Sequence, residues 1–170
     1  MRVRQGSIRD WPFMYSLGKI NIPDSASPWR KQPLEETIKY REAVLKGFWT
    51  WIQQTGSIVF IAEAAAEDVN DNTPIRESGG NQSLGYLVLH PSSREELTGV
   101  YQGWIMDFGV LPEWRGQKIG EKLLKAAEEY CRQHNIAYLG LACSSHNIPA
   151  LHLYEKSGFV EERKIMVKCL

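Results

Sequence analysis

A loop that combines glycines with cationic side chains is the first stretch of this sequence suited to chemistry. Gly116 and Gly120 lie on either side of Lys118, and Arg115 directly precedes the first glycine. The loop leads into a helical pattern, and the first backbone N–H groups of a helix have no partner within the helix. Such N–H groups, the positive end of the helix dipole and nearby cations together bind phosphate. We therefore predict an anion-binding loop at residues 115–120, although an ordinary turn between a strand and a helix could contain the same glycines.

The elements that position this loop follow from the spacing of apolar residues. A short apolar run over residues 104–110 predicts a β-strand, which Pro112 ends. From Ile119 the apolar residues repeat with a helical period as far as the last turn at His134, and Asn135 suits the left-handed end of the helix. Neither G-x-x-x-x-G-K-[S/T] nor G-x-G-x-x-G occurs, so these two phosphate-binding motifs are excluded.

Two blocks of this sequence resemble the N-acetyltransferases of the GNAT superfamily. Residues 110–120, V-L-P-E-W-R-G-Q-K-I-G, are similar to the family's acyl-CoA signature [Q/R]-x-x-G-x-[G/A] after a strand that ends in valine. Lys118 stands where the signature has its middle glycine. Residues 147–159, N-I-P-A-L-H-L-Y-E-K-S-G-F, match the family's N-x-x-A-x-x-L-Y-x-K-x-G-F at every position. The blocks have the family's order and spacing, and the resemblance is loose before about residue 56.

The resemblance implies a single GNAT-like domain over residues 1–170, in the α/β (α+β) class. The sheet would be mixed and mostly antiparallel, with helices on both faces and two parallel strands that splay apart, residues 104–110 and 137–143. The pantetheine arm of acetyl-CoA would lie in the gap between these strands, because an unpaired strand edge offers N–H and C=O groups to an extended ligand. The cofactor-binding residues would be Phe108, Gly109, Val110, Arg115, Gly116, Gln117, Lys118, Ile119, Gly120, Asn147 and Lys156.

Two side chains are implied to move protons, and each has a structural alternative. Tyr154 matches the family's tyrosine and would protonate the departing CoA thiolate, or else it packs its ring. Asp107 would act as the base through a water molecule, or it would attract a cationic amine. Equally, its carboxylate could form only structural hydrogen bonds. Glu63 is a weaker candidate for the base. Cys143 lacks an evident base partner, which argues against a cysteine nucleophile.

The remaining elements are predicted from periodicity, glycine and proline. In the first half, strands are expected at 2–9, 57–65 and 83–89, and helices at 11–17 and 33–54. Asp10 is expected to cap the first of these helices. A polar loop is expected at 66–82 and a connection at 90–102. Asn147 is expected to cap a helix at 148–156, and Gly158 to end it. Residues 159–170 are expected to form two edges. Because the family has a longer hairpin there, the acceptor side is expected to be shallower or completed by a partner subunit.

Composition describes an ordinary globular domain and excludes several classes of protein. The chain has 170 residues, of which 43% are hydrophobic, and its 20 Lys+Arg balance 20 Asp+Glu. No basic field is therefore present to attract nucleic acid or a membrane surface. No apolar run has membrane-spanning length, and the first residues lack the apolar core of a signal peptide. Three cysteines without a C-x-x-C predict free thiols, no metal and a cytoplasmic protein.

These observations lead to one functional hypothesis and two alternatives. We expect an enzyme that moves an acetyl group from acetyl-CoA to a primary amine, on a small molecule, a lysine or a peptide N-terminus, by direct attack in a ternary complex. The first alternative is a CoA-binding regulatory module without turnover, and the second is an unrelated nucleotide-binding α/β protein. A homodimer is possible. An aromatic pocket for a cationic acceptor and a place in the core are equally open for Tyr15, Trp29, Tyr40 and Trp49.

Overall fold

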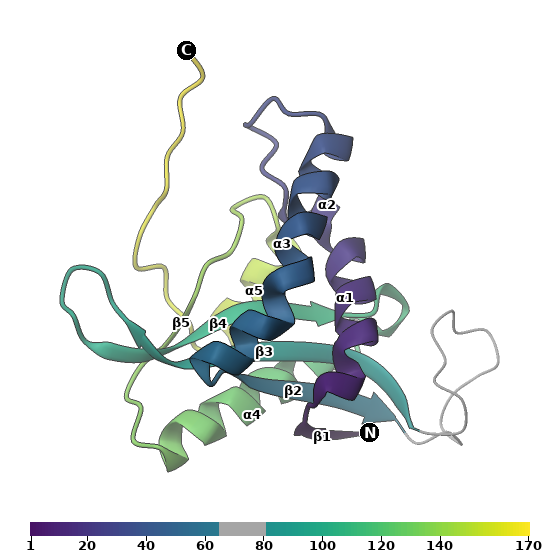
Figure 1. The fold of residues 1–170 in the computed structure, drawn as a ribbon. Helices are drawn as coiled ribbons and strands as arrows, with labels where there is room; N and C mark the ends of the chain where they lie inside the picture. Colours follow the sequence, from purple (N-terminus) through teal and green to yellow (C-terminus); the bar gives the residue numbers. More distant parts are fainter. Residues whose placement is uncertain (65–80) are drawn as a thin grey trace.

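The computed structural model describes residues 1–64 and 81–170, which form a five-stranded sheet with helices on both faces (Figure 1). The strand order is β1-β2-β3-β4-β5. The first four strands are antiparallel to their neighbours, and β4 and β5 run parallel. The strands are β1 (Arg2–Gln5), β2 (Ile58–Ala64), β3 (Gln82–Arg94), β4 (Tyr101–Val110) and β5 (Leu139–Leu141). The predicted class, a mostly antiparallel mixed sheet with one parallel pair, is confirmed.

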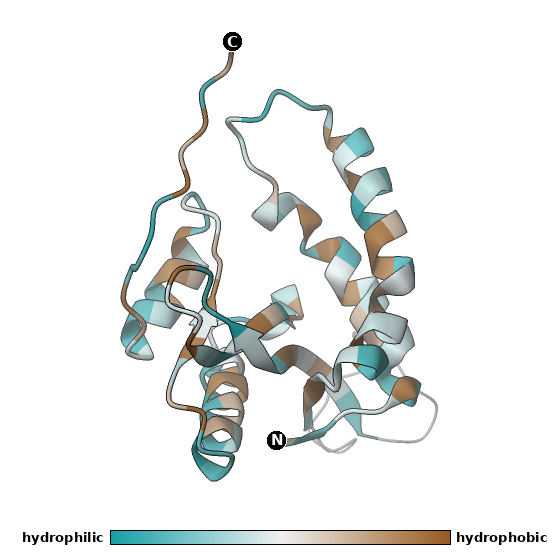
Figure 2. Ribbon diagram, turned by 60° about the vertical axis from the view of Figure 1, so that its left-hand side comes forward, coloured by the Kyte–Doolittle hydropathy of each residue, from teal (hydrophilic) through white to brown (hydrophobic). Residues whose placement is uncertain are grey.

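The helices divide between the two faces of the sheet (Figure 1). One face carries α1 (Trp11–Ile20), α2 (Ile22–Ser25) and α3 (Leu34–Thr55), and the other carries α4 (Ile119–Gln133) and α5 (Ile148–Lys156). Figure 2, turned from the first view, shows the two groups of helices on opposite sides of the sheet. This division means that a ligand between β4 and β5 can be approached by different helices from the two sides.

Each face of the sheet has its own apolar core, and β3 contributes to both. Every residue from Leu84 to Leu89 is buried, because helices cover the strand on both sides. The core on the α4 side includes Leu84, Leu87, Leu89, Ile105, Ile119, Leu123, Leu124 and Ala127. The core on the α1–α3 side includes Phe13, Met14, Leu17, Ile52, Tyr86, Val88 and Leu111. Burial of this apolar surface supplies the main favourable term in folding and fixes the strands that hold the site.

The long connection predicted at residues 90–102 is wrong, because most of it is strand. Strand β3 continues to Arg94 and β4 begins at Tyr101, so that only a short turn joins them. Pro91 obscured this in the sequence, since proline cannot donate to a ladder. The structure accommodates it in an irregular part of the pairing, between His90 and Ser93. In the turn, Gly99 has φ 69° and Glu95 accepts hydrogen bonds from backbone N–H groups.

Two further predictions about the chain ends are corrected. Asp10 does not cap α1, because its carboxylate instead accepts hydrogen bonds from Arg4 and from the backbone N–H of Ser7. No strand forms over residues 160–170, which extend away from the sheet in both views (Figures 1 and 2). The side chains of Ile165 and Met166 are at least 90% exposed. The polar loop predicted at 66–82 lies outside the described residues except for its end, where Gln82 begins β3.

Candidate active site

The anion-binding loop meets α4 without a side-chain cap. Lys118 is the N-cap residue of α4 and makes no capping hydrogen bond, so the N–H groups of the first turn remain available to a ligand. Lys118 has φ 62° and Gly116 has φ 76°, both in the left-handed region. Position 118 therefore needs the conformation that glycine adopts at no steric cost. A lysine fits there, although it is strained by the clash of its Cβ with the backbone.

The cationic side chains around the loop are mostly engaged with protein groups. The Arg115 guanidinium contacts Asp24 at 3.0 Å and Asn21 at 2.9 Å, which ties the loop to the α1–α2 junction. Lys156 forms an ion pair of 2.7 Å with Glu121 and so neutralises the carboxylate nearest the loop. Among the described residues, Lys118 has no ion-pair partner. Lys118 is thus the cation best placed to meet a ligand phosphate at this loop.

Strands β4 and β5 separate as predicted, and the last residues of β4 are left unpaired on that side. Pairing runs only from Gly103 with Leu139 to Ile105 with Leu141. Beyond this point, β4 extends through Val110 without a partner from β5. The α4 N-terminus follows this free edge after a short turn. An extended ligand can therefore add to the edge of β4 while its anionic end lies at the loop.

A β-bulge at Met106 decides which backbone groups face the gap. Asp107 pairs with Val88 and Ile105 with Leu89, so Met106 has no partner in β3. The Gly103 N–H donates toward β5, whereas the Leu111 N–H, eight residues later, donates to Leu84 in β3. In a regular strand, residues an even number apart would point to the same side. The extra residue reverses the side to which the following backbone groups point. The N–H and C=O groups of Phe108 and Val110 therefore face the gap between β4 and β5.

Two of the three predicted backbone partners can therefore bind a ligand, and the third has another purpose. The Phe108 N–H donates to Asp107 Oδ1 and the Val110 carbonyl accepts from Arg115, which leaves the Phe108 carbonyl and the Val110 N–H for a ligand. Gly109 faces β3 by the same alternation. A Cβ on Gly109 would collide with Asn21 Nδ2, so this glycine admits the end of α1. The missing Cβ of Gly109 thus serves the packing of α1 on β4.

Tyr154 lies on α5 against the unpaired part of β4. Its ring is 6.2 Å from the Phe108 ring and 5.8 Å from the Phe159 ring, centroid to centroid. Within the described residues, its hydroxyl has no hydrogen-bond partner. Burial raises the pKa of Tyr154 well above its usual value, and the nearby Cys143 and Asp107 raise it further. The phenol is therefore a protonated hydrogen-bond donor at neutral pH.

Asp107 lies on the opposite face of β4 from Phe108, as strand alternation predicted. Its Oδ2 accepts a hydrogen bond from the Tyr86 hydroxyl at 2.9 Å, and its Oδ1 accepts from the Phe108 N–H at 2.9 Å. Burial raises the pKa of Asp107, while these two hydrogen bonds and the charge of Arg41 partly oppose the rise. A carboxyl with a raised pKa is a better general base than an ordinary aspartate. Tyr86 was not identified from sequence, since it appeared only as one apolar residue in a strand.

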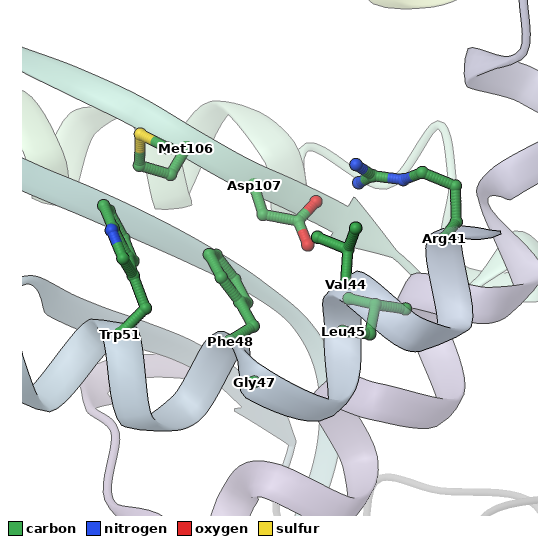
Figure 3. A pocket seen from close by; sticks show the side chains of 8 residues that line it. All are labelled: Arg41, Val44, Leu45, Gly47, Phe48, Trp51, Met106 and Asp107. Carbon is green, nitrogen blue, oxygen red and sulfur yellow. The ribbon is translucent and has the colours of Figure 1, made fainter.

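A cavity lies between α3 and β4, next to Asp107. It has a volume of about 400 Å³, and Figure 3 shows the side chains around it. The lining residues are Arg41, Val44, Leu45, Gly47, Phe48, Trp51, Met106 and Asp107. None of the four aromatic residues proposed for an acceptor pocket lines this cavity. Helical periodicity alone could not show which face of α3 meets the bulge in β4.

The aromatic residues proposed earlier lie elsewhere. Trp49 packs against Trp11, with ring centroids 6.1 Å apart, and Tyr15 lies beside Trp11. Tyr40 is 68% exposed and Trp29 is 55% exposed. Trp49 and Trp51 are two residues apart on α3, which is more than half a helical turn, so their side chains point to different sides of the helix.

The other candidates have structural partners. Asn147 Oδ1 accepts a hydrogen bond from the Ala150 N–H at 3.3 Å, which confirms that Asn147 caps α5. Gly158 has φ 87° and Asn135 has φ 56°, as predicted for helix ends. The prediction of Glu63 as a candidate base is corrected. Its carboxylate binds Arg2 and Arg4 at the β1 side of the sheet, remote from the gap between β4 and β5.

Comparisons with known proteins agree with this geometry. The profile of the acetyltransferase (GNAT) family matches residues 14–159, and the chain belongs to this family. Streptothricin acetyltransferase A of Bacillus subtilis is 27% identical over 150 residues, which cover 87% of this chain and 85% of the relative. A putative ribosomal protein bS18-alanine N-acetyltransferase of the same organism is 39% identical over 85 residues, 46% of this chain and 55% of the relative. The chain is thus an acetyltransferase by family.

The fold has close counterparts among solved structures. A putative acetyl transferase from Pyrococcus furiosus superposes with a TM-score of 0.69 at 22% identity, covering 99% of both chains. At this identity the likeness establishes the fold. Within residues 1–64 and 81–170, no helix is long and apolar enough to cross a membrane. The same residues include no group of three or more His, Cys, Asp or Glu side chains arranged to hold a metal ion.

Proposed function

We propose that this protein transfers an acetyl group from acetyl-CoA to a primary amine by direct attack in a ternary complex. One observation supports the proposal. The uncapped N-terminus of α4 follows the unpaired edge of β4, and the protonated phenol of Tyr154 lies beside that edge. An anion-binding site, an extended edge and a hydrogen-bond donor are the three features that a thioester on a long phosphorylated arm requires.

Acetyl-CoA would be held mainly by the backbone. The diphosphate would lie on the N–H groups of residues 115–120, with the Lys118 ammonium beside it. The amides of the pantetheine arm would pair with the Phe108 carbonyl and the Val110 N–H. Arg115, Gln117 and Asn147 would act by shaping the site, because the structure gives their side chains protein partners. Lys156 would act likewise by pairing with Glu121.

The reaction needs two proton movements, and the site has a group for each. The acceptor nitrogen attacks the thioester carbonyl carbon, a C–N bond forms, the C–S bond breaks and the thiolate leaves. Asp107 accepts the proton of the ammonium acceptor, directly or through a water molecule, on the α3 side of β4. Tyr154 protonates the departing sulfur from the α5 side, and the second proton that the attacking nitrogen loses restores the phenol. Such positioned groups each contribute about 10²–10⁴-fold to the rate.

The two relatives indicate which acceptors to test first. One is named for streptothricin, a small molecule, and the other for the alanine of a ribosomal protein. For the present chain, small-molecule amines and peptide N-termini or lysines are both proposed as acceptors. Solvent can reach the pocket beside Asp107 through the exposed edges of Val44 and Met106, so an acceptor can enter separately from acetyl-CoA.

A thiol-release assay tests the proposal. Purified protein is incubated with acetyl-CoA and a panel that includes streptothricin, spermidine, amino acids and an alanine-initiated peptide. Release of free CoA thiol that requires both an amine and the protein is the expected result. In parallel, CoA should raise the melting temperature in proportion to the logarithm of its concentration above Kd. A CoA-dependent rise without turnover of any amine would instead support a regulatory CoA-binding module.

A further inference from the structure

The pocket between α3 and β4 has two chemically different ends, and these limit what the proposed acetyl transfer can use as an acceptor. At one end, the Phe48 and Trp51 rings are stacked, with centroids 5.5 Å apart and planes inclined by 9°. Met106, which is 40% exposed, covers the same end from β4 (Figure 3). A flat or branched apolar group would bury this surface, and the hydrophobic effect favours that burial.

The other end of the pocket is cationic. Arg41 comes from the N-terminal half of α3, and its guanidinium points toward Asp107 (Figure 3). Among the described residues, Arg41 has no ion pair. Guanidinium groups bind carboxylates through two parallel hydrogen bonds, so this end is suited to a ligand carboxylate. A polyamine would instead bring a second cation toward Arg41, which is unfavourable.

Asp107 lies between the two ends. Tyr86 and Phe108 each donate one hydrogen bond to its carboxylate and hold it in place, while the carboxylate also lines the pocket. A carboxylate oxygen accepts more than one hydrogen bond, so an ammonium group can bind on the pocket side. Along the pocket the protein thus offers a cation, an anion and then an apolar surface. A ligand that matches this order carries an anion, a cation and then an apolar group.

We infer that the acceptor is a free α-amino acid with an aromatic or large apolar side chain. In such a molecule one carbon carries the carboxylate, the amine and the side chain, which would face Arg41, Asp107 and the Phe48–Trp51 pair in turn. A Cβ at Gly47 would meet no atom within 4 Å, so the pocket has room at that point of its wall. The volume of about 400 Å³ is within the range of small-molecule sites. A peptide N-terminus has an amide in place of the carboxylate and fits less well.

A comparison of matched acceptors tests this inference, which rests on the proposed function. The value of kcat/KM from thiol release is measured with phenylalanine, phenylalaninamide, phenethylamine, alanine and spermidine. Phenylalanine should exceed phenethylamine and phenylalaninamide by about tenfold or more, the effect of one charge-assisted hydrogen-bond pair. Phenylalanine should also exceed alanine, because only its ring reaches the apolar end.

Two variants assign these preferences to residues. Because loss of the Arg41 charge also raises the pKa of Asp107, Arg41→Gln is compared with the native protein on the plateau of the pH profile, above the acid limb. There it should lower kcat/KM for phenylalanine about tenfold more than kcat/KM for phenethylamine. Lys46→Gln, on the same helix but outside the pocket, is the matched control and should change neither. Trp51→Ala should remove the preference for phenylalanine over alanine, and a thermal unfolding curve checks that this variant is folded.

Failure of the acceptor assignment is distinguishable from failure of the proposed function. Turnover of phenethylamine, spermidine or streptothricin without turnover of amino acids would overturn the assignment and leave acetyl transfer intact. An Arg41→Gln variant that loses activity equally toward phenylalanine and phenethylamine would also overturn it. If no amine releases thiol and CoA does not change the melting temperature, the proposed function is wrong and the assignment fails with it.

Discussion

At the scale of single residues, Tyr154 and Asp107 divide the proposed chemistry between opposite faces of β4. Tyr154 reaches the strand edge from α5, and Asp107 faces α3. The alternation of side chains along the strand makes this division possible, and the bulge at Met106 turns the Phe108 and Val110 backbone toward the gap. Donor and acceptor molecules can therefore approach the same few residues of β4 from different sides, as a ternary complex requires.

Removal of the Tyr154 hydroxyl should impair turnover without impairing CoA binding. Tyr154→Phe keeps the ring that packs on Phe108 and Phe159, so the fold of α5 should be preserved. We expect kcat to fall about 10²–10⁴-fold, while the Kd for CoA from thermal shift or calorimetry stays within about twofold. Tyr130→Phe, on α4 with its ring 6.2 Å from that of Phe60, is the control. Equal steady-state rates for Tyr154→Phe and the native protein would exclude Tyr154 from the mechanism.

The Tyr86–Asp107 hydrogen bond should determine the pH dependence of the reaction. The bond stabilises the ionised carboxylate, so its loss in Tyr86→Phe should raise the pKa of Asp107 further. Because Asp107 must be ionised to accept a proton, the acid limb of the kcat/KM profile should move to higher pH. The measurement is kcat/KM from pH 5 to 9 for both proteins. An acid limb that stays in place would show that Asp107 does not titrate in the reaction.

At the scale of elements, the α4 N-terminus explains why the family signature has a glycine at position 118. The left-handed conformation there costs a non-glycine residue about 1–2 kcal/mol, and Lys118 bears that cost. Lys118→Gly should therefore stabilise the fold by about 0.5–1 kcal/mol, the strain less the greater freedom of glycine when unfolded. Urea unfolding at pH 7 measures this change.

The same substitution should weaken CoA binding, because it removes the cation without an internal partner. We expect the Kd to rise about three- to tenfold, equivalent to one exposed charge pair. Lys118→Ala separates the two effects, since it lacks the ammonium and keeps the strain. A Lys118→Gly variant with unchanged CoA affinity would show that the backbone alone holds the diphosphate.

The sequence predicted the elements around the two motifs more accurately than the elements that respond to tertiary contacts. The helix from Ile119 and the Asn147 cap were correct because local periodicity and capping determine them. The separated strands were correct because the family resemblance implied them. The strand through Pro91 and the bulge at Met106 were missed, because both depend on pairing with a distant strand. The pocket was missed for the same reason, since Phe48 and Trp51 acquire a partner only when α3 packs beside β4.

At the scale of the whole molecule, a buried charge cluster attaches the N-terminal strand to the sheet. Glu63 on β2 is 4% exposed and accepts hydrogen bonds from Arg2, Arg4 and Asn81. Arg4 also binds Asp10, so one guanidinium joins β1, β2 and the start of α1. Glu63 had no evident partner in the sequence, because its two arginine partners are about sixty positions away.

Glu63 should make the stability of the fold depend on pH in the acid range. Burial alone would raise the pKa of Glu63, but hydrogen bonds from Arg4, Asn81 and Arg2 lower it to about 2, against 4.5 for an ordinary glutamate. A lowered pKa means that the stabilisation is complete above pH 4.5 and is lost as the pH falls toward 2. Glu63→Gln should therefore reduce the free energy of unfolding by about 2 kcal/mol at pH 7, and the difference from the native protein should shrink below pH 4.5.

Urea unfolding of both proteins at pH 7, 4 and 3 measures this difference, and a surface pair provides the comparison. Glu128 forms an ion pair with Arg132 one turn later on α4, where Arg132 is 60% exposed. Glu128→Gln should cost less than about 0.5 kcal/mol at any of these pH values, because solvent screens the pair. A loss for Glu63→Gln that is as small as this, or that persists unchanged at pH 3, would mean that packing of β1, and not its charges, holds the N-terminus in place.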